Sequence, residues 1–357
     1  NKSNFFLFTP LLHEVATGGL TPDSIVESIR EVFRGSAVNI VEDTVIELDK
    51  ANKTVRTSTT SFIYDYLVIS TGAETNYFGT PGAQENTFAL KNLSDAVALR
   101  NHIIETWEEA VATDNKDLLV TAIVGAGPTG VELAAEMLEF KQHTFDMYYK
   151  SSMFKKEDIK VKVITATPDL ISQFPIEMRE LAMEELNEKG IEVITNAIVT
   201  KVEPNLLTFK DGNTLKAHTI VWVAGVTAGK GGRLEVSKTL QTTANPEVFA
   251  LGDVAGKDPM LAQVAVQQAK VVAKNIYALV KSDGLIEFNF KQKGLLISIG
   301  QWYAIGHFFG ITFKGRIMWW IWRTIYLFNF LSWRKRFEIM HEWTTNLFYP
   351  RDISYLK

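Results

Sequence analysis

Cysteine is absent from all 357 residues of this chain. Its absence excludes a redox-active disulfide, a thiolate nucleophile and any iron–sulfur or zinc site held by cysteine. Histidine is also scarce, and His13, His307 and His341 have no carboxylate or second histidine at ligand spacing, so we expect no metal site. Any electron transfer by this protein must therefore run through bound organic cofactors.

The chain also lacks an excess of charge of either sign and an apolar run that could span a bilayer. Its 37 basic and 41 acidic residues give no global basis for binding nucleic acid. The apolar stretch at residues 317–333 is interrupted by polar side chains and is shorter than the ~20 residues that a spanning helix needs. A chain of this length, with 46% hydrophobic residues, is expected to form two or three domains.

The strongest motif is a G-x-G-x-x-G pattern formed by Gly125, Gly127 and Gly130. It follows an apolar run at 118–124 and precedes a helix-forming run at 131–138. A strand that leads through such a turn into a helix is typical of dinucleotide binding, because the turn brings the backbone close to a pyrophosphate at the positive helix end. The alternative is a glycine-rich structural turn.

Further elements favour an α/β fold with two Rossmann-like dinucleotide-binding domains, one inserted in the other. Strands that end in small residues are expected at 64–72, 221–226 and 248–253. Another strand is expected at 159–164, after the strand, turn and helix of the glycine motif. The inner part is expected to include an amphipathic helix at 175–189, a strand at 191–194 and a hairpin or meander at 199–215 that turns at Asp211-Gly212.

Together these residues resemble the two-dinucleotide-binding-domain flavoprotein reductases, and within them type II NADH dehydrogenase, the single-subunit NADH:quinone oxidoreductase. The resemblance rests on residues 9–19, 125–132, 262–268 and the tryptophan-rich, basic C-terminus, and it covers essentially the whole chain. It implies an enzyme that oxidises NADH through FAD, gives two electrons to a membrane quinone (ubiquinone or menaquinone) and pumps no protons.

The resemblance also implies which parts of the chain bind each cofactor and which part attaches to the membrane. The implied parts are an FAD-binding domain at 1–88 and 223–300, an NADH-binding domain at 89–222, and a C-terminal membrane-attachment region at 301–357. The implied cofactor-binding residues are Pro10, Thr71, Gly72, Gly125, Gly127, Thr129, Gly130, Glu132, Thr165, Ala224, Gly225, Gly252, Asp253, Ala262 and Gln263. The implied catalytic residues are Glu132, Gln263 and Gln267.

Four of these residues have a simpler alternative. Glu132 is implied to lie near the nicotinamide ring, but a carboxylate there could simply stabilise the positive helix end. Asp253 is implied to contact the flavin ribityl chain, but Gly-Asp is often only a turn. Gln263 and Gln267 share one helix face with small alanines and are implied to border the quinone; outside this family they would be ordinary solvent-facing residues.

Two departures from the family pattern affect cofactor binding. The family opens with its own strand, glycine turn and helix, and Asn1 corresponds to a point about 35–40 residues into that unit, so we expect the chain as written to bind FAD weakly. The strand before Thr165 ends without the carboxylate that usually selects NAD. NADH is favoured by the resemblance, and NADPH stays an alternative.

The C-terminus predicts attachment to a membrane surface. Six of the eight tryptophans follow residue 300, and Arg316, Arg323 and Arg334 are spaced to fall on one stripe of a helix over 317–333. Such a helix suits the headgroup region of anionic lipid. With the resemblance, this predicts a peripheral protein on the cytoplasmic face of the cell inner membrane. The alternatives are a core helix or the interface of a homodimer.

Two other functions remain as alternatives. One is a soluble NAD(P)H-dependent flavoprotein reductase of a ferredoxin-type partner, which would leave the aromatic C-terminus unexplained. The other is a non-catalytic, flavin-less membrane or NAD-binding module, which only the missing first glycine turn supports. Disulfide reductases and sulfide:quinone reductases are excluded by the absence of cysteine.

Overall fold

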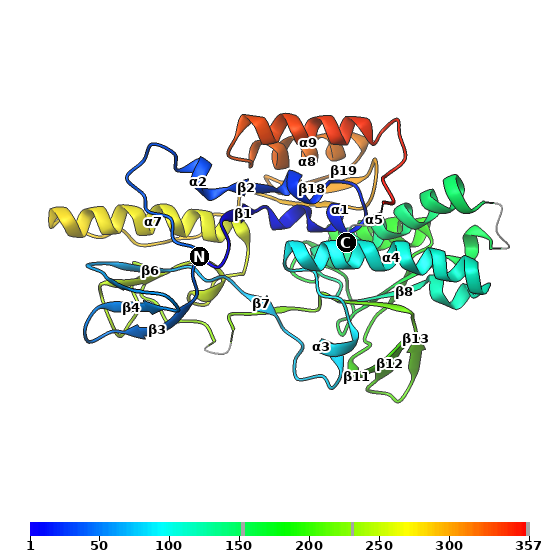
Figure 1. The fold of residues 1–357 in the computed structure, drawn as a ribbon, viewed down its shortest axis with the longest axis horizontal. Helices are drawn as coiled ribbons and strands as arrows, with labels where there is room; N and C mark the ends of the chain where they lie inside the picture. The colour runs from blue at the N-terminus through cyan, green and yellow to red at the C-terminus, as the bar shows by residue number, and fades with distance from the viewer. Residues whose placement is uncertain (151–153, 230–231, 355–357) are drawn as a thin grey trace. The chain divides into compact units, whose positions relative to one another are not determined.

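The computed structural model describes residues 1–150, 154–229 and 232–354, which form two compact units (Figure 1). Unit 1 consists of Asn1–Asn4, Gly35–Asn76 and Val226–Lys293. Unit 2 consists of Phe5–Arg34, Tyr77–Gly225 and Gly294–Lys357. The four parts predicted above were assigned by the cofactor or membrane that each is expected to bind, whereas the two units are compact parts of the structure. The four-part division therefore stays a prediction.

Unit 2 is built on a parallel sheet with the strand order β10-β9-β8-β14. The strands are β8 (Val120–Val124), β9 (Lys160–Ile164), β10 (Glu192–Ile194) and β14 (Thr219–Trp222). Their residues are mostly β-branched, and β14 is buried throughout, as expected for a parallel sheet covered on both faces. The strands predicted at 118–124, 159–164 and 191–194 are thus confirmed.

Helices α4 (Leu93–Thr113), α5 (Pro128–Thr144) and α6 (Ile176–Lys189) accompany this sheet. Helix α5 begins with proline directly after Gly127, where a missing backbone N–H costs nothing. It continues to Thr144, beyond the predicted 138, and Phe140, Lys141 and Thr144 are buried in this extension. Helix α6 confirms the helix predicted at 175–189 and ends at Gly190, which has the left-handed conformation.

The predicted meander is an antiparallel sheet of β11 (Val199–Glu203), β12 (Leu206–Phe209) and β13 (Thr214–Lys216). The turn at Asp211-Gly212 is also confirmed: Gly212 has a φ of +86°, and the Asn213 N–H donates to Asp211 Oδ1 at 3.0 Å.

The remaining elements of unit 2 come from both ends of the chain. In chain order they are β1 (Phe5–Leu7), η1 (Thr9–Leu11), α1 (Leu12–Ala16), η2 (Pro22–Ile25), β2 (Val26–Ser28), α2 (Ile29–Val32), α3 (Ala83–Asn86), η3 (Lys116–Leu119), η4 (Phe145–Tyr149), η5 (Lys156–Asp158), β17 (Leu295–Ser298), β18 (Ala304–Phe308), β19 (Ile311–Gly315), α8 (Arg316–Phe328) and α9 (Trp333–Thr345). Helix α1 is buried along its whole length and packs on α4 and α5. Trp107, Trp319 and Trp322 are among the largest buried side chains of the core.

The C-terminal segment is two helices rather than the single helix predicted over 317–333. Helix α8 ends at Phe328 and α9 begins at Trp333, and the two pack against each other (Figure 1). The break is stabilised by Ser332, whose side chain caps α9 and whose N–H donates to the buried carboxylate of Glu27 at 2.8 Å. Sequence periodicity does not reveal a break whose partner lies 305 residues away.

The predicted arginine stripe is therefore wrong. Arg316 and Arg334 are exposed, but they belong to different helices. Arg323 turns toward the core, with its guanidinium carbon 3.8 Å from the centre of the Trp319 ring. Within the described ranges 1–150, 154–229 and 232–354, no helix has the length and apolar character that crossing a bilayer requires.

Unit 1 contains the other strands that the sequence predicted. Its elements are β3 (Val45–Asp49), β4 (Thr54–Thr57), β5 (Ser61–Ile63), β6 (Leu67–Ile69), β7 (Glu74–Thr75), β15 (Val226–Thr227), β16 (Val248–Ala250), η6 (Gly252–Val254) and α7 (Ala262–Lys281). Strands β6 and β16 pair in parallel and confirm, in shorter form, the strands expected at 64–72 and 248–253. The strand expected at 221–226 is interrupted between Trp222 and Val226.

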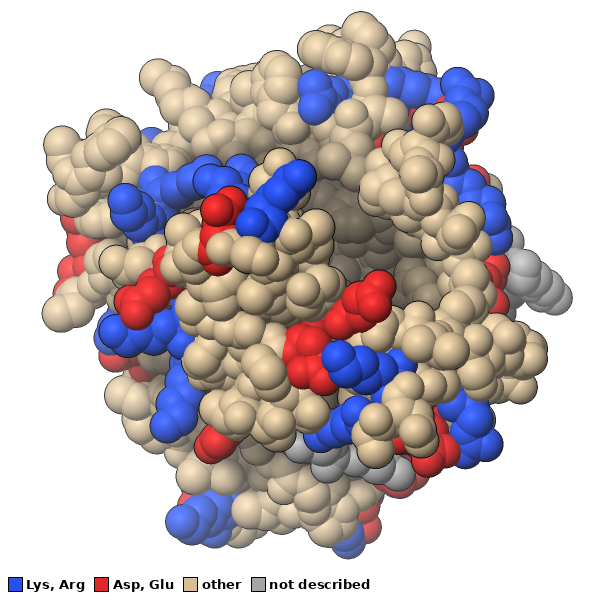
Figure 2. Space-filling view, turned by 90° about the vertical axis from the view of Figure 1, so that its left-hand side faces the viewer, with Lys and Arg blue, Asp and Glu red and all other residues tan. Residues whose placement is uncertain are grey.

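Charges of both signs are mixed on the face of the molecule that Figure 2 shows. On the face shown in Figure 2, basic and acidic side chains are interspersed among a larger area of other residues. No part of that face carries a large area of one sign.

Candidate active site

The glycine motif forms the turn between β8 and α5 in unit 2. Gly125 has a φ of +118°, and a Cβ there would lie 2.5 Å from the backbone of Ala224. A Cβ on Gly130 would lie 1.9 Å from the carbonyl oxygen of Gly125. Both positions therefore require glycine for packing. Gly127 has no atom within 4 Å of a built Cβ, so its backbone is open to a ligand.

A cavity of about 430 Å³ opens beside this turn, within the usual range for a small-molecule site. Its lining includes Gly127, Thr165, Asp169, Ala224 and the ring of Phe78. The cavity thus reaches from the first turn of α5 to the end of β9, which is the span that a dinucleotide occupies in this kind of fold. These residues fit NADH, since a Cβ at position 127 would fill the place of the pyrophosphate.

Of the other residues predicted in unit 2, Thr165 also lines the cavity. Thr165 directly follows β9 and is buried. A Cβ on Gly225 would lie 2.8 Å from the Phe78 ring, so glycine is also needed there. Thr129 is exposed on the first turn of α5. Pro10 is half-buried in η1.

Glu132 lies on the same helix, with 6% of its surface exposed. Its Oε1 accepts a hydrogen bond of 3.2 Å from the backbone N–H of Ser298. Burial raises the pKa of Glu132 to about 8. A carboxyl with a raised pKa carries less negative charge near neutral pH, which weakens its interaction with the helix dipole.

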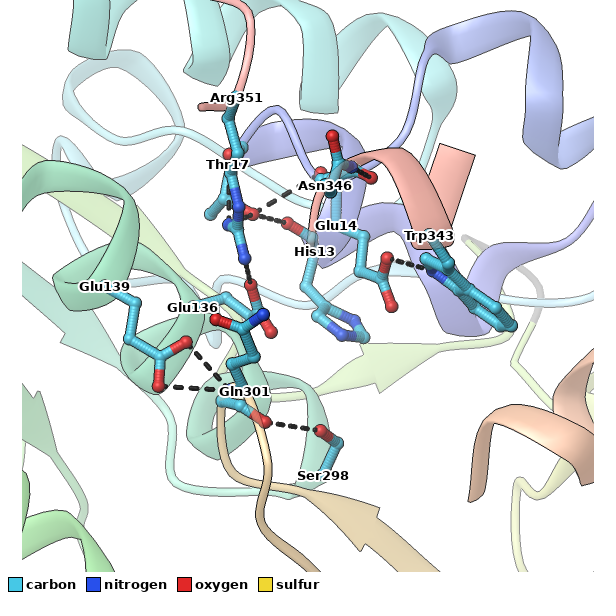
Figure 3. Close-up of polar contacts among 12 residues, drawn as sticks. His13, Glu14, Thr17, Glu136, Glu139, Ser298, Gln301, Trp343, Asn346 and Arg351 are labelled. Carbon is cyan, nitrogen blue, oxygen red and sulfur yellow. Dashed lines mark hydrogen bonds and ion pairs between the residues drawn. The ribbon is translucent and has the colours of Figure 1, made fainter. Parts of the chain in front are cut away.

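Figure 3 shows a buried polar cluster that the sequence did not reveal. Glu132 interacts electrostatically with two of its members, Glu14 and Glu136. Arg351 forms an ion pair with Glu136 on α5 and donates to the Thr17 carbonyl oxygen at 3.2 Å. Glu14 of α1 accepts a hydrogen bond of 2.6 Å from Trp343 Nε1. The sequence feature that could have indicated this cluster is the pair Glu132 and Glu136, which are four residues apart on a helix that is otherwise apolar there.

The ionisation of this cluster follows from its burial. Burial raises the pKa of Glu14 to about 7 and lowers the pKa of His13 to about 4. Burial also lowers the pKa of Arg323 to about 10, against the attraction of Glu14 and Glu136. The cluster therefore holds carboxyl groups that bind protons near neutral pH, beside guanidinium groups that keep their charge.

The residues predicted for the flavin in unit 1 lie at the ends of its two parallel strands. Thr71 and Gly72 follow β6, and Gly72 has a φ of +72°. Gly252 and the half-buried Asp253 form η6 after β16. The Gly252 N–H donates to Gln268 Oε1 at 2.7 Å.

Gln268 is the residue of this region that the sequence missed. It is fully buried on α7, and its Nε2 donates to Asp258 Oδ2 at 2.9 Å. The glutamine thus fixes the Gly-Asp turn from the helix side. Gln268 is the last residue of the motif A-Q-V-A-V-Q-Q, but the sequence-based prediction included only Gln263 and Gln267, which share a helix face.

Gln263 and Gln267 lie on one face of α7, as predicted, and both are half-buried. Gln267 binds the backbone of Lys291 twice: Nε2 donates to its carbonyl oxygen at 2.9 Å, and Oε1 accepts from its N–H at 3.1 Å. Gln263 Oε1 accepts from the Lys293 N–H at 3.1 Å. They are therefore not merely solvent-facing side chains. Ala262 is exposed at the start of the helix.

Comparisons with known proteins decide the family. The family described as pyridine nucleotide-disulphide oxidoreductase matches residues 1–269, and the NDH2 C-terminal domain matches residues 292–352. The chain is 32% identical to a type II NADH:quinone oxidoreductase of Haemophilus influenzae, over 84% of this chain and 78% of the relative. The chain belongs to the type II NADH:quinone oxidoreductases.

Other relatives agree with membership of the type II NADH:quinone oxidoreductases. The enzyme of Mycobacterium tuberculosis is 29% identical, over 98% of this chain and 82% of the relative. The structure of NDH2 from Plasmodium falciparum in complex with NADH matches the fold with a TM-score of 0.91 at 20% identity, covering 99% of this chain and 93% of that one. The predicted fold class is thereby confirmed, and the alternative functions are not favoured.

Proposed function

We propose that this protein oxidises NADH in the cavity beside Gly127 and reduces a quinone. As a type II NADH:quinone oxidoreductase it is an FAD-dependent enzyme. FAD supplies the redox chemistry when bound, because it accepts a hydride from NADH and gives two electrons to quinone. The observation that carries the NADH half is the opening of the Gly127 backbone onto the cavity at the start of α5.

The chain binds NADH through its backbone. The first N–H groups of α5 have no partner within the helix, and the positive end of the helix dipole lies at the same place. Because Gly127 leaves this end uncovered, the pyrophosphate binds there and the adenosine extends toward Thr165.

Glu132 then lies on the nicotinamide side of the turn. Its neutral carboxyl can hydrogen-bond the substrate without placing a negative charge beside the ring. A negative charge there would favour the cationic product NAD⁺ and slow its release. We propose that burial of Glu132 serves this purpose.

In unit 1, Asp253 is proposed to contact the ribityl chain of FAD, in a turn fixed by Gln268. The unit fits this role, because Gly252 has a φ of +73°, which favours glycine. Gln263 and Gln267 are proposed to form a wall of the quinone site. Their hydrogen bonds to residues 291–293 fix the position of that segment.

The C-terminal helices are proposed to attach the protein to an anionic lipid surface. Helix α8 exposes a second apolar stripe besides its buried one, formed by Ile317, Trp320 and Phe328. Phe309, at the tip of the β18–β19 hairpin, is fully exposed. Exposed apolar and aromatic residues beside the basic Arg316 suit the headgroup region. The cytoplasmic face of the inner membrane is the proposed location.

Helix α9 contributes to the same proposed surface. Trp333, Phe337 and Met340 are exposed at helical spacing, and Arg334 is exposed beside them. The alternative is that a second copy of the chain covers this surface in a homodimer. Lipid is favoured because aromatic residues are interleaved with exposed arginines, as at a headgroup layer.

The quinone assignment is tested by separating the two half-reactions in stopped-flow experiments on the FAD-loaded enzyme. Gln263→Leu should leave flavin reduction by NADH near the wild-type rate and slow reoxidation by quinone about tenfold. Gln84→Leu, at an exposed position on α3, is the matched control and should change neither rate. Slower reduction with normal reoxidation would reverse the assignment.

A further inference from the structure

The end of strand β9 is where a dinucleotide fold that selects NAD usually carries a carboxylate for the adenosine ribose. This chain has Thr165 there. The Thr165 hydroxyl is 2.8 Å from the Thr167 hydroxyl and accepts the Thr167 N–H at 3.2 Å. It is therefore engaged in its own loop, and it carries no charge that could distinguish a ribose hydroxyl from a ribose phosphate.

A carboxylate does line the same cavity, four residues further on. Asp169 belongs to the loop between β9 and α6 and lines the cavity together with Thr165 and Gly127. Its backbone carbonyl accepts a hydrogen bond of 2.8 Å from the Thr167 hydroxyl. Thr165, Thr167 and the backbone of Asp169 are thus linked by successive hydrogen bonds.

This loop is fixed to the phosphate-binding turn. The Ile171 N–H donates to the carbonyl oxygen of Ala126, inside the glycine motif, at 2.7 Å. Ile171 is buried and has a φ of +39°, which a β-branched residue adopts only when its surroundings impose it. The distance from the Gly127 backbone to Asp169 is therefore set by structure rather than by a mobile loop.

A cation holds the Asp169 side chain from the other side. Arg179 of α6 places Nη1 3.2 Å from Asp169 Oδ2, while its Nε donates to the Phe174 carbonyl oxygen at 2.7 Å. Asp169 is half exposed, and Arg179 is less exposed than Asp169. Without the aspartate, the same guanidinium would be an anion-binding group at the edge of the cavity.

We propose that Asp169 is the residue that selects NADH over NADPH, in place of the carboxylate absent at Thr165. It accepts hydrogen bonds from the adenosine ribose, repels a 2′-phosphate, and neutralises Arg179, which would otherwise attract that phosphate. The inference rests on the proposed function, because it requires NADH in this cavity.

The test measures binding rather than turnover. ADP-ribose and 2′-phospho-ADP-ribose carry no nicotinamide, so they bind the FAD-loaded enzyme without reducing it, and calorimetry gives a Kd for each. Wild type should bind ADP-ribose at least tenfold more tightly. Asp169→Asn should reduce this ratio about tenfold, mainly by tighter binding of the phosphorylated probe.

Two further variants separate the charge effects. Asp169→Asn combined with Arg179→Met should lose the gain in 2′-phospho-ADP-ribose affinity, since the attracting cation is gone. Glu177→Gln removes one negative charge from an exposed position on the same helix, and it should leave the ratio unchanged. A similar change in Glu177→Gln would overturn the proposal by showing a general charge effect.

The proposal and the proposed function fail in different ways. If Gly127→Val does not weaken ADP-ribose binding, the nucleotide is not in this cavity and the proposed NADH site is wrong. If Gly127→Val weakens binding and Asp169→Asn leaves the ratio of the two Kd values at the wild-type figure, only the selectivity role of Asp169 is overturned.

Discussion

Arg351 forms a buried ion pair with Glu136, although 215 residues separate them in the chain. Burial alone would raise the pKa of Glu136, but the Arg351 guanidinium holds it below its usual value. The pair ties the C-terminal segment to α5, the helix whose first turn borders the nucleotide cavity. The ion pair thus links the position of the C-terminal segment to that of α5.

Removing one partner of this pair should be costly. Arg351→Met leaves a buried carboxylate without its counter-charge and should lower the free energy of unfolding by about 3–5 kcal/mol. Glu136→Gln combined with Arg351→Met should be more stable than Arg351→Met alone, because the stranded charge is gone. Thermal unfolding of the three proteins measures this, and equal melting temperatures for the single and double variants would contradict the coupling.

Much of the proposed nucleotide site could be predicted from the sequence, because most residues that determine its structure lie close together in the chain. Gly125 adopts a φ of +118° in this turn, and a Cβ on Gly130 would meet the Gly125 carbonyl oxygen, so these two requirements act within a few residues, although the close approach of Gly125 to Ala224 does not. The meander at 199–215 and the helix at 175–189 follow from periodicity in the same way.

The buried cluster and the C-terminal break could not be predicted, because they depend on partners distant in the chain. Nothing near Glu14 indicates that Trp343 will donate to it, and nothing near Ser332 indicates Glu27. A sequence pattern also does not show which face of α8 lies inward, since both faces are apolar. For that reason Arg323 was predicted on a lipid-facing stripe, whereas its guanidinium lies over the Trp319 ring.

Substitutions in the glycine turn should separate binding from folding. Gly127→Val adds a side chain in open space at an ordinary φ of −71°, so the folded enzyme should keep FAD while the KM for NADH rises roughly tenfold or more. Gly130→Ala places a Cβ against the Gly125 carbonyl and should destabilise the unit by about 1–3 kcal/mol. Steady-state kinetics and melting curves check both, and loss of FAD from Gly127→Val would reverse the assignment of cofactors to units.

Burial of Glu132 makes stability depend on pH. Its pKa is raised in the folded state, so its contribution is fully present below the unfolded value of 4.5 and is lost as the pH rises to about 8. Glu132→Gln removes this dependence, and its stability relative to wild type should grow by on the order of 1 kcal/mol per pH unit across that window. Melting temperatures between pH 5 and 8 measure the difference, and a constant difference would show that Glu132 is ionised when buried.

The lipid surface proposed for the C-terminal helices should depend on their exposed residues alone. Ile317→Ser with Trp320→Ser should abolish sedimentation with anionic vesicles while the melting temperature stays near that of wild type. Charge reversal at Arg316 and Arg334 should weaken binding by about 1 kcal/mol for each residue at low salt and less at high salt. Phe62→Ser, an exposed residue of unit 1, is the control and should bind normally. A dimer that dissociates on these substitutions, with vesicle binding unchanged, would assign the surface to a second copy of the chain.

The proposed function requires that one chain accepts electrons from NADH and gives them to quinone through bound FAD. The most direct measurement is anaerobic double mixing of the FAD-loaded enzyme, followed at the flavin absorption band. One equivalent of NADH should bleach the band, and one equivalent of quinone should then restore it fully with formation of one quinol. A band that NADH does not bleach, or a bleached band that quinone does not restore, would show that this chain does not carry electrons from NADH to quinone.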